Sequence, residues 1–155
     1  MEPDRLIAVA RAIVDDNVYL TLATADAEGR PWASPVWFAA EGHTEYYWVS
    51  TPEARHSLNL SARAEVGIVI FDSRVQPGGG QALYVEATAR ELQGAELERG
   101  IDLFSRVSEA QLGTAWSLED VVAPAAHRLY GAVAGRCFVL DKEVRGHDER
   151  TEVAL

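Results

Sequence analysis

The sequence contains little cysteine and no long hydrophobic run. Cys137 is the single cysteine among 155 residues, so no intrachain disulfide can form. Its neighbours are typical of a strand, and we expect a buried, unreactive thiol. No apolar stretch approaches the roughly 20 residues that cross a bilayer, and the acidic residues 1–5 lack the basic region of a signal peptide. We therefore expect a cytoplasmic protein with no membrane partner.

Basic residues are also scarce. The chain has 14 Lys and Arg residues against 24 Asp and Glu residues, for a formal net charge of -10. Lysine occurs once, at Lys142, and the arginines are placed singly along the chain. Because a negative field repels nucleic acid and anionic lipid, we expect neither as a partner.

The motifs of several enzyme classes are missing as well. The sequence has no GxGxxG or GxxxxGK[ST] phosphate loop and no GxSxG nucleophile elbow. Its four histidines, at positions 43, 56, 127 and 147, do not have the spacing of a metal site. A chain without an evident general base or nucleophile favours a bound cofactor as the source of any chemistry.

The apolar periodicity that is present predicts one α+β domain. Residues 4–16 carry a helical stripe, and three alternating segments joined by short turns predict an antiparallel meander. We expect strands at 18–24, 31–39, 45–50, 66–72, 81–91 and 127–140, the last bent at Gly135, and helices at 4–16, from about 50 to 60, and at 94–108. This order indicates an antiparallel barrel of about six strands with peripheral helices, over residues 1–140, followed by a polar tail at 141–155.

Pro35 lies in the middle of the second expected strand. Proline cannot donate a ladder hydrogen bond, so this position is at a sheet edge, at a bulge, or beside something other than a strand. An edge strand and a flat ligand lying along this backbone both fit the sequence.

The segment from Ser50 to His56 is the strongest candidate for a binding site. Ser50 or Thr51 as N-cap, Pro52 in the first turn and Glu53 three residues after Ser50 predict a helix start with a capping box. The positive end of a helix attracts phosphate, which Arg55 can grip with two parallel N–H bonds and His56 can support when it is protonated. Many such helix starts bind nothing, so both interpretations stay open at this point.

Tryptophans at positions 32, 37 and 48 fall in the second and third expected strands, and Trp116 lies in an irregular segment. Aromatic side chains in a small barrel are most often core residues. Trp116 is the best candidate for stacking on a ligand because no regular element contains it.

Taken together, the segments "YLTLATADAEGRPWASPVWFA", "YYWVSTPEARHSLNLSARAEVGIVIFD" and "GQALYVEATAREL" resemble the pyridoxamine 5'-phosphate oxidase-like split-barrel family over roughly residues 5–140. The resemblance implies a six-stranded split barrel that forms homodimers and binds FMN, or a deazaflavin in some members. It further implies contacts to the flavin ring from Ala33, Ser34, Pro35, Val36 and Trp37, and contacts to its polar edge and ribityl tail from Val49, Ser50 and Thr51. By the same resemblance, Arg55 and His56 would hold the phosphate. Gln81 and Trp116 would approach the flavin from the partner subunit or the opposite wall.

The sequence also departs from this family in two respects. The second strand lacks the arginine and lysine that the oxidases use for phosphate binding, and His56 stands where many relatives carry lysine. We therefore do not expect a vitamin B6 substrate. The leading hypothesis is an FMN-dependent oxidoreductase of unidentified substrate, with catalytic residues unknown. The alternatives are a deazaflavin-dependent reductase of the same fold and a non-catalytic barrel that binds flavin or haem.

Overall fold

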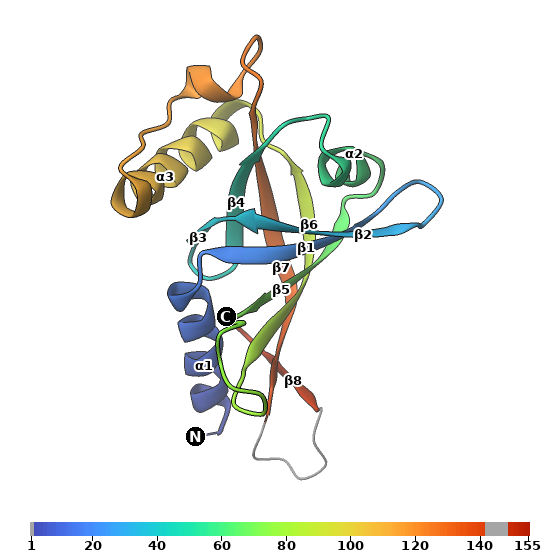
Figure 1. Ribbon diagram of the computed structural model, residues 1–155, viewed down its shortest axis with the longest axis vertical. Helices are drawn as coiled ribbons and strands as arrows, with labels where there is room; N and C mark the ends of the chain where they lie inside the picture. Colours follow the sequence, from blue (N-terminus) through green and yellow to red (C-terminus); the bar gives the residue numbers. More distant parts are fainter. Residues whose placement is uncertain (1, 142–148) are drawn as a thin grey trace.

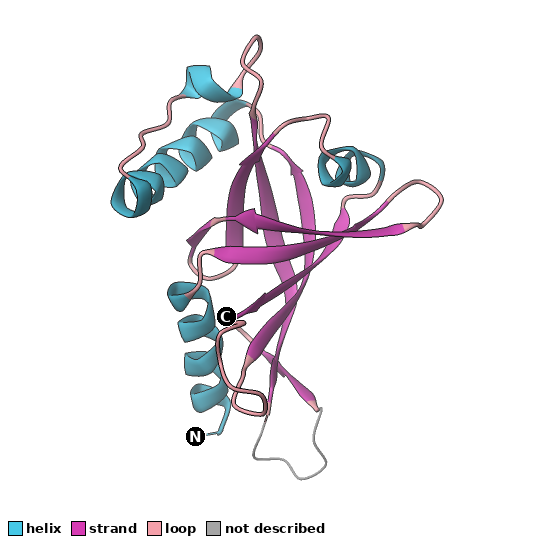
Figure 2. Cartoon of the chain, in the orientation of Figure 1, coloured by secondary structure: helices cyan, strands magenta, loops and turns pink. Residues whose placement is uncertain are grey.

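A curled antiparallel sheet with helices around it forms the structure, a computed structural model that describes residues 2–141 and 149–155 (Figure 1; Figure 2). Within these residues the strands are β1 (Tyr19–Ala25), β2 (Pro31–Trp37), β3 (Ala39–Glu41), β4 (Glu45–Ser50), β5 (Glu65–Phe71), β6 (Ala82–Glu91), β7 (Arg128–Leu140) and β8 (Arg150–Val153). The helices are α1 (Glu2–Asp16), α2 (Arg55–Ala62), α3 (Gly94–Leu112) and the short 3-10 helix η1 (Leu118–Val121). The sheet order is β2-β1-β5-β6-β7-β4-β3, with β8 added to β7.

The sheet curls because its two end strands are consecutive in the chain. β2 pairs with β1 and β3 pairs with β4, and Phe38 alone separates the two strands. The Phe38 backbone N–H donates to the Val18 carbonyl at 3.0 Å, and the chain then changes partner at Ala39. This α+β split barrel is the predicted fold class. The prediction of one strand over 31–39 was wrong, since alternation shows which face a residue occupies but not which strand it pairs with.

β7 is long and bent, as expected at Gly135. Ala87 is opposite Ala134 and Val85 is opposite Cys137, so one residue of β6 faces two of β7 in a bulge. β4 pairs with the first half of β7 and β8 with the second half. The sheet therefore has eight strands in the described residues rather than the six expected, because the division at Phe38 and the addition of β8 each contribute one.

The C-terminal segment 141–155 was expected to be a polar tail. Residues 142–148 of it lie outside the described residues. Beyond them, β8 continues the sheet and buries Val153 against the barrel core. Cys137, opposite Val153, is buried as expected, and burial raises the pKa of its thiol.

The start of α2 differs from the predicted capping box. Residues 51–54 form a turn, and the helix begins at Arg55 after Ala54, with no side-chain hydrogen bond to the cap. Ser50 remains paired with Arg128 as the last residue of β4. The chain must leave the strand before it can enter the helix, so the Ser50 hydroxyl is too early in the chain to cap it.

Two apolar cores lie on opposite sides of the sheet. The first fills the barrel, where the fully buried Trp48 stacks on Tyr130 with a centroid distance of 6.2 Å. The second lies under α3, where Leu97, Ile101 and Phe104 pack with Leu129 of β7. α3 extends to Leu112, four residues beyond the predicted end, and Gly113 ends it with a φ of 72°.

The tryptophans divide between these cores and the surface. Trp48 is core as predicted, and Trp37 and Trp116 pack at the margin of the second core. Trp32 is 41% exposed, so the core interpretation was wrong for this residue. It lies on the edge strand β2, whose first three residues are all exposed. None of the described helices is long and apolar enough to cross a bilayer.

Gly100 lets α3 approach the sheet closely. A Cβ at this position would lie 3.0 Å from a methyl carbon of Leu129 and 3.0 Å from one of Leu92. We expect Gly100→Val to lower the free energy of unfolding by about 1–3 kcal/mol, the usual cost of overpacking a core. Gly80→Val is the control, since nothing lies within 4 Å of its Cβ position. Urea denaturation measures both variants, and equal stability would contradict this account of helix seating.

Candidate functional site

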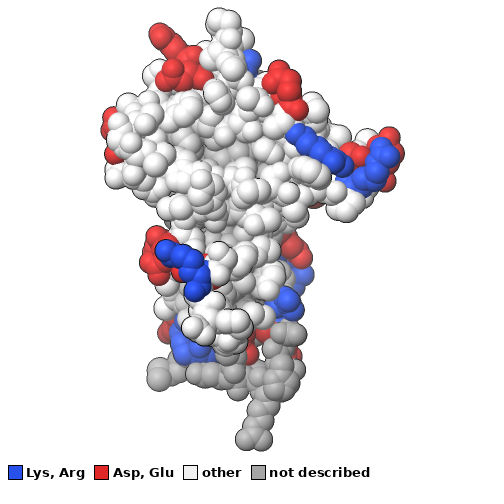
Figure 3. All heavy atoms as spheres, viewed as in Figure 1, with Lys and Arg blue, Asp and Glu red and all other residues white. Residues whose placement is uncertain are grey.

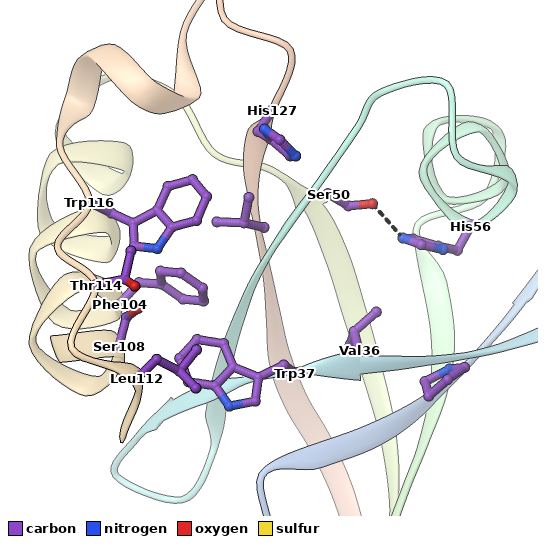
Figure 4. Close-up of a pocket in the computed structure, with 12 residues that line it drawn as sticks. Val36, Trp37, Ser50, His56, Phe104, Ser108, Leu112, Thr114, Trp116 and His127 are labelled. Carbon is purple, nitrogen blue, oxygen red and sulfur yellow. Dashed lines mark hydrogen bonds between the residues drawn. The ribbon is translucent and has the colours of Figure 1, made fainter. Parts of the chain in front are cut away.

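A pocket of about 480 Å³ opens between α3 and the strands β2 and β4 (Figure 4). One side, which we call the strand wall, consists of Pro35, Val36, Trp37, Val49 and Ser50, with His56 from α2. The opposite side, which we call the α3 wall, consists of Phe104, Ser108, Leu112, Thr114 and Trp116. His127, just before β7, lies at one end.

The strand wall includes an open sheet edge. β2 pairs with β1 on one side and is the last strand in the sheet order, so its other edge has no ladder partner among the described strands. Pro35 is paired across from Thr21 and is exposed, which confirms the edge interpretation of this proline. The unpaired edge leaves main-chain donors and acceptors beside the pocket.

Ser50 and His56 meet on this wall. The Ser50 Oγ and the His56 Nε2 are 3.0 Å apart, and Figure 4 shows this contact near the N-terminal end of α2. Burial lowers the pKa of His56, because the interior disfavours the charged imidazolium. Burial therefore favours the neutral imidazole in the ligand-free protein, and a negative charge nearby would favour the protonated form.

The beginning of α2 provides a positive end next to His56. Its first N–H groups have no partner within the helix, no side chain caps it, and its first turn contains no acidic residue. The Arg55 guanidinium carbon lies 4.1 Å from the centroid of the Trp32 ring in a cation–π contact. Arg55 is exposed and does not line the pocket in this arrangement.

The predicted site residues fall into three groups. Seven line the pocket together: Pro35, Val36, Trp37, Val49, Ser50, His56 and Trp116. Ala33, Ser34, Thr51 and Arg55 belong to the same segments but lie outside its lining. Gln81 is remote from the pocket of its own chain, since its Nε2 donates to the Leu140 carbonyl at 2.6 Å near the other end of β7.

The α3 wall was largely missed by sequence reasoning. Phe104, Ser108 and Leu112 are spaced four residues apart and therefore share one face of α3. This spacing was visible in the sequence, but the predicted helix ended at Ser108. Thr114 and His127 lie in irregular segments, where no periodicity could have indicated them.

The aromatic rings of the pocket are held in place by specific contacts. Phe104 meets the Trp37 ring edge-on at 5.1 Å and the Trp116 ring at 5.9 Å, and Trp116 meets His127 at 6.0 Å. The Trp37 Nε1 donates to the Gln111 Oε1 at 2.8 Å, and the Trp116 backbone N–H donates to Ser105. The described residues contain no cluster of His, Cys, Asp and Glu that could hold a metal ion.

A family model for pyridoxamine 5'-phosphate oxidase matches residues 6–132 of this chain. The chain belongs to the pyridoxamine 5'-phosphate oxidase family. The matched residues include the whole strand wall and the whole α3 wall. No curated protein matches this family member significantly.

Several solved structures share the fold of this oxidase-family chain. A haem-binding protein from Mycobacterium smegmatis is 20% identical with a TM-score of 0.67, over 94% of this chain and 56% of that protein. The haem storage protein HutZ from Vibrio cholerae is 20% identical with a TM-score of 0.67, over 86% of this chain and 94% of that protein. ChuZ from Campylobacter jejuni is 14% identical with a TM-score of 0.70, over 95% of this chain and 58% of that protein. The chain thus spans little more than half of the first and third proteins.

The lowered pKa of His56 predicts a pH dependence of stability. The unfolded chain binds more protons than the folded one between the lowered pKa and the ordinary value of 6.5. The free energy of unfolding therefore decreases as the pH falls through this interval. An NMR titration of the imidazole protons checks the pKa, with His56→Gln to assign the signal. A value at or above 6.5 in the ligand-free protein would contradict the burial argument.

Proposed function

We propose that this chain is an FMN-dependent oxidoreductase that holds the cofactor along the strand wall of the pocket. The observation that carries the proposal is a combination of two kinds of chemistry, contributed by the pocket and by the start of α2 beside it. It joins an unpaired sheet edge and aromatic side chains to a helix N-terminus with an adjacent arginine. A flat ring on a phosphate-bearing tail requires both.

The start of α2 suits the phosphate end of FMN. Its unpartnered N–H groups and dipole favour an anion, and its first turn contains no acidic residue, although Glu53 lies just before the N-cap residue Ala54. Trp32 holds the Arg55 guanidinium next to this helix end without neutralising it. A dianionic phosphate here would also favour the protonated form of His56, whose Nε2 now meets Ser50.

The rest of the strand wall suits the flavin ring of FMN. Val36 and Val49 supply apolar contact, and the free edge of β2 supplies main-chain groups for the polar rim of a ring. Bound FMN would supply hydride transfer through its N5 atom. The residues of this chain bind and orient the reactants and exclude water, which is the protein's usual share of cofactor chemistry.

Haem binding without catalysis is the second candidate function. Two histidines line the pocket, and a neutral imidazole such as that of His56 can ligate iron. Two of the proteins with this fold are named for haem. FMN is preferred because α2 offers a phosphate site. A deazaflavin ranks behind FMN, since its longer anionic tail needs more cations than this acidic chain provides.

Parallel titrations of the purified protein with FMN, a deazaflavin and haemin distinguish these functions. Flavin fluorescence and the haem Soret band report binding, and added NADH or NADPH reports whether bound flavin is reduced. We expect FMN to bind and to be reduced. Haemin binding with no FMN binding at tens of micromolar would support the haem alternative, and tight FMN that no nicotinamide donor or oxygen alters would support a non-catalytic barrel.

Arg55 provides a sharper test of the cofactor's orientation. We expect Arg55→Ala to weaken FMN binding by about 1.5–3 kcal/mol, the range of a charged hydrogen bond. Arg74→Ala is the matched control, because Arg74 is an exposed arginine paired with Asp72 in the loop before β6. Isothermal calorimetry measures both variants. Equal affinity in wild type and Arg55→Ala would remove this residue from the site.

We also propose that two copies of the chain form a homodimer. The support is the family resemblance together with a hollow where β5, β6 and β7 meet, in which Val66, Ala87 and Val133 lie among the charged residues Glu65, Glu86 and Arg136. Val133 of β7 is 45% exposed and so is available for a contact with a second copy. We expect Val133→Glu to shift the protein toward monomer in sedimentation velocity, and Val75→Glu, at an exposed loop valine, to leave it unchanged.

A further inference from the structure

We propose that the α3 wall is the substrate subsite and that it accepts a neutral, flat aromatic molecule bearing one hydrogen-bonding group, which the Ser108 hydroxyl holds. The role as a substrate site rests on the proposed function, in which the cofactor occupies the opposite wall. Figure 4 shows Phe104, Ser108, Leu112 and Trp116 on one side of the pocket and Val36, Ser50 and His56 on the other.

Ser108 is the pocket residue whose buried polar side chain has no hydrogen-bond partner in the described structure. Its residue is 0% exposed, and its Oγ has no hydrogen-bond partner among the described parts of the chain. A buried hydroxyl without a hydrogen bond is costly, and native proteins usually satisfy such groups. Ser108 also lines the pocket, so a ligand there can supply the missing bond.

The surroundings of Ser108 favour an aromatic ring. Phe104 and Leu112, one turn before and one turn after it, give apolar contact, and Trp116 adds a ring at an angle of 78° to Phe104. Trp37 is fixed by Gln111 and Trp116 by Ser105. These rings are therefore held in position before a ligand arrives, which reduces the entropy lost on binding.

The charge of the pocket disfavours an anionic substrate. No Asp, Glu, Lys or Arg belongs to its described lining, and burial disfavours the charged form of His56. Figure 3 shows an uncoloured surface between α3 and α2, with charged side chains only around it. An anion on the α3 wall would lose hydration without gaining a cation, and the net charge of -10 would repel it further.

Calorimetric titrations with 1-naphthol, 1-naphthoate and naphthalene test this chemistry on both FMN-free and FMN-loaded protein. The three probes share one ring system and differ in the hydroxyl and the charge. We expect 1-naphthol to bind at least about tenfold more tightly than 1-naphthoate, because a buried unpaired carboxylate is penalised. Equal affinity for the neutral and the anionic probe would overturn the inference.

Ser108→Ala tests the hydrogen bond. We expect it to weaken 1-naphthol about 3- to 10-fold, the effect of one neutral hydrogen bond, and to leave naphthalene and FMN binding unchanged. Ser73→Ala, at an exposed loop serine, is the control. An equal loss for naphthol and naphthalene would make Ser108 a packing residue and overturn its assigned role.

Thr114→Lys is a second variant, at an exposed position on the same wall. A cation there should reverse the preference and favour 1-naphthoate, and no change in preference would place the ligand elsewhere.

FMN binding separates this inference from the proposed function. Naphthol selectivity without FMN binding would support the ligand chemistry and overturn the flavin assignment, whereas FMN binding without naphthol selectivity would overturn the substrate subsite alone.

Discussion

The strand β7 is the constraint on which the rest of the structure depends. It pairs with β6 along most of its length, with β4 before the bulge at Gly135 and with β8 after it. Its first half contributes Tyr130 to the barrel core and Leu129 to the core beneath α3. Because alternate residues of one strand face opposite sides of the sheet, β7 connects the two cores. The pocket lies where these elements meet, between β4 and α3.

Close packing then fixes the distance between the two walls of that pocket. Gly100 allows α3 to lie against Leu129 and Leu92, and the ring contacts from Trp37 through Phe104 to Trp116 continue this packing to the pocket surface. A larger residue at the helix contact would move the α3 wall as a unit, since the interior has little free volume to absorb it. The position of Phe104, Ser108 and Leu112 in the site is thus a consequence of helix seating, whereas Thr114, Trp116 and His127 come from irregular segments.

The charge distribution divides the site into two regions. The chain is strongly acidic, yet the described lining of the pocket contains no formal charge from Asp, Glu, Lys or Arg. The positive features lie together at the start of α2, where Arg55 rests on Trp32 beside the helix end. An anionic group is favoured at that end and disfavoured on the α3 wall. This asymmetry orients a ligand that has both a charged tail and a flat ring.

The sequence by itself determined the fold class and most of the helices and strands, because local periodicity and turn chemistry act over a few neighbouring residues. The seven pocket residues among the predicted site residues came from the family resemblance and not from local patterns. The sequence did not determine the change of partner at Phe38, the late start of α2 at Arg55 or the exposure of Trp32. These depend on which strand β2, β3 and β4 pair with, and such pairings are long-range. The α3 wall was likewise decided by tertiary structure: the sequence shows Phe104, Ser108 and Leu112 on one helix face, but only the seating of α3 on β7 turns that face toward the strand wall.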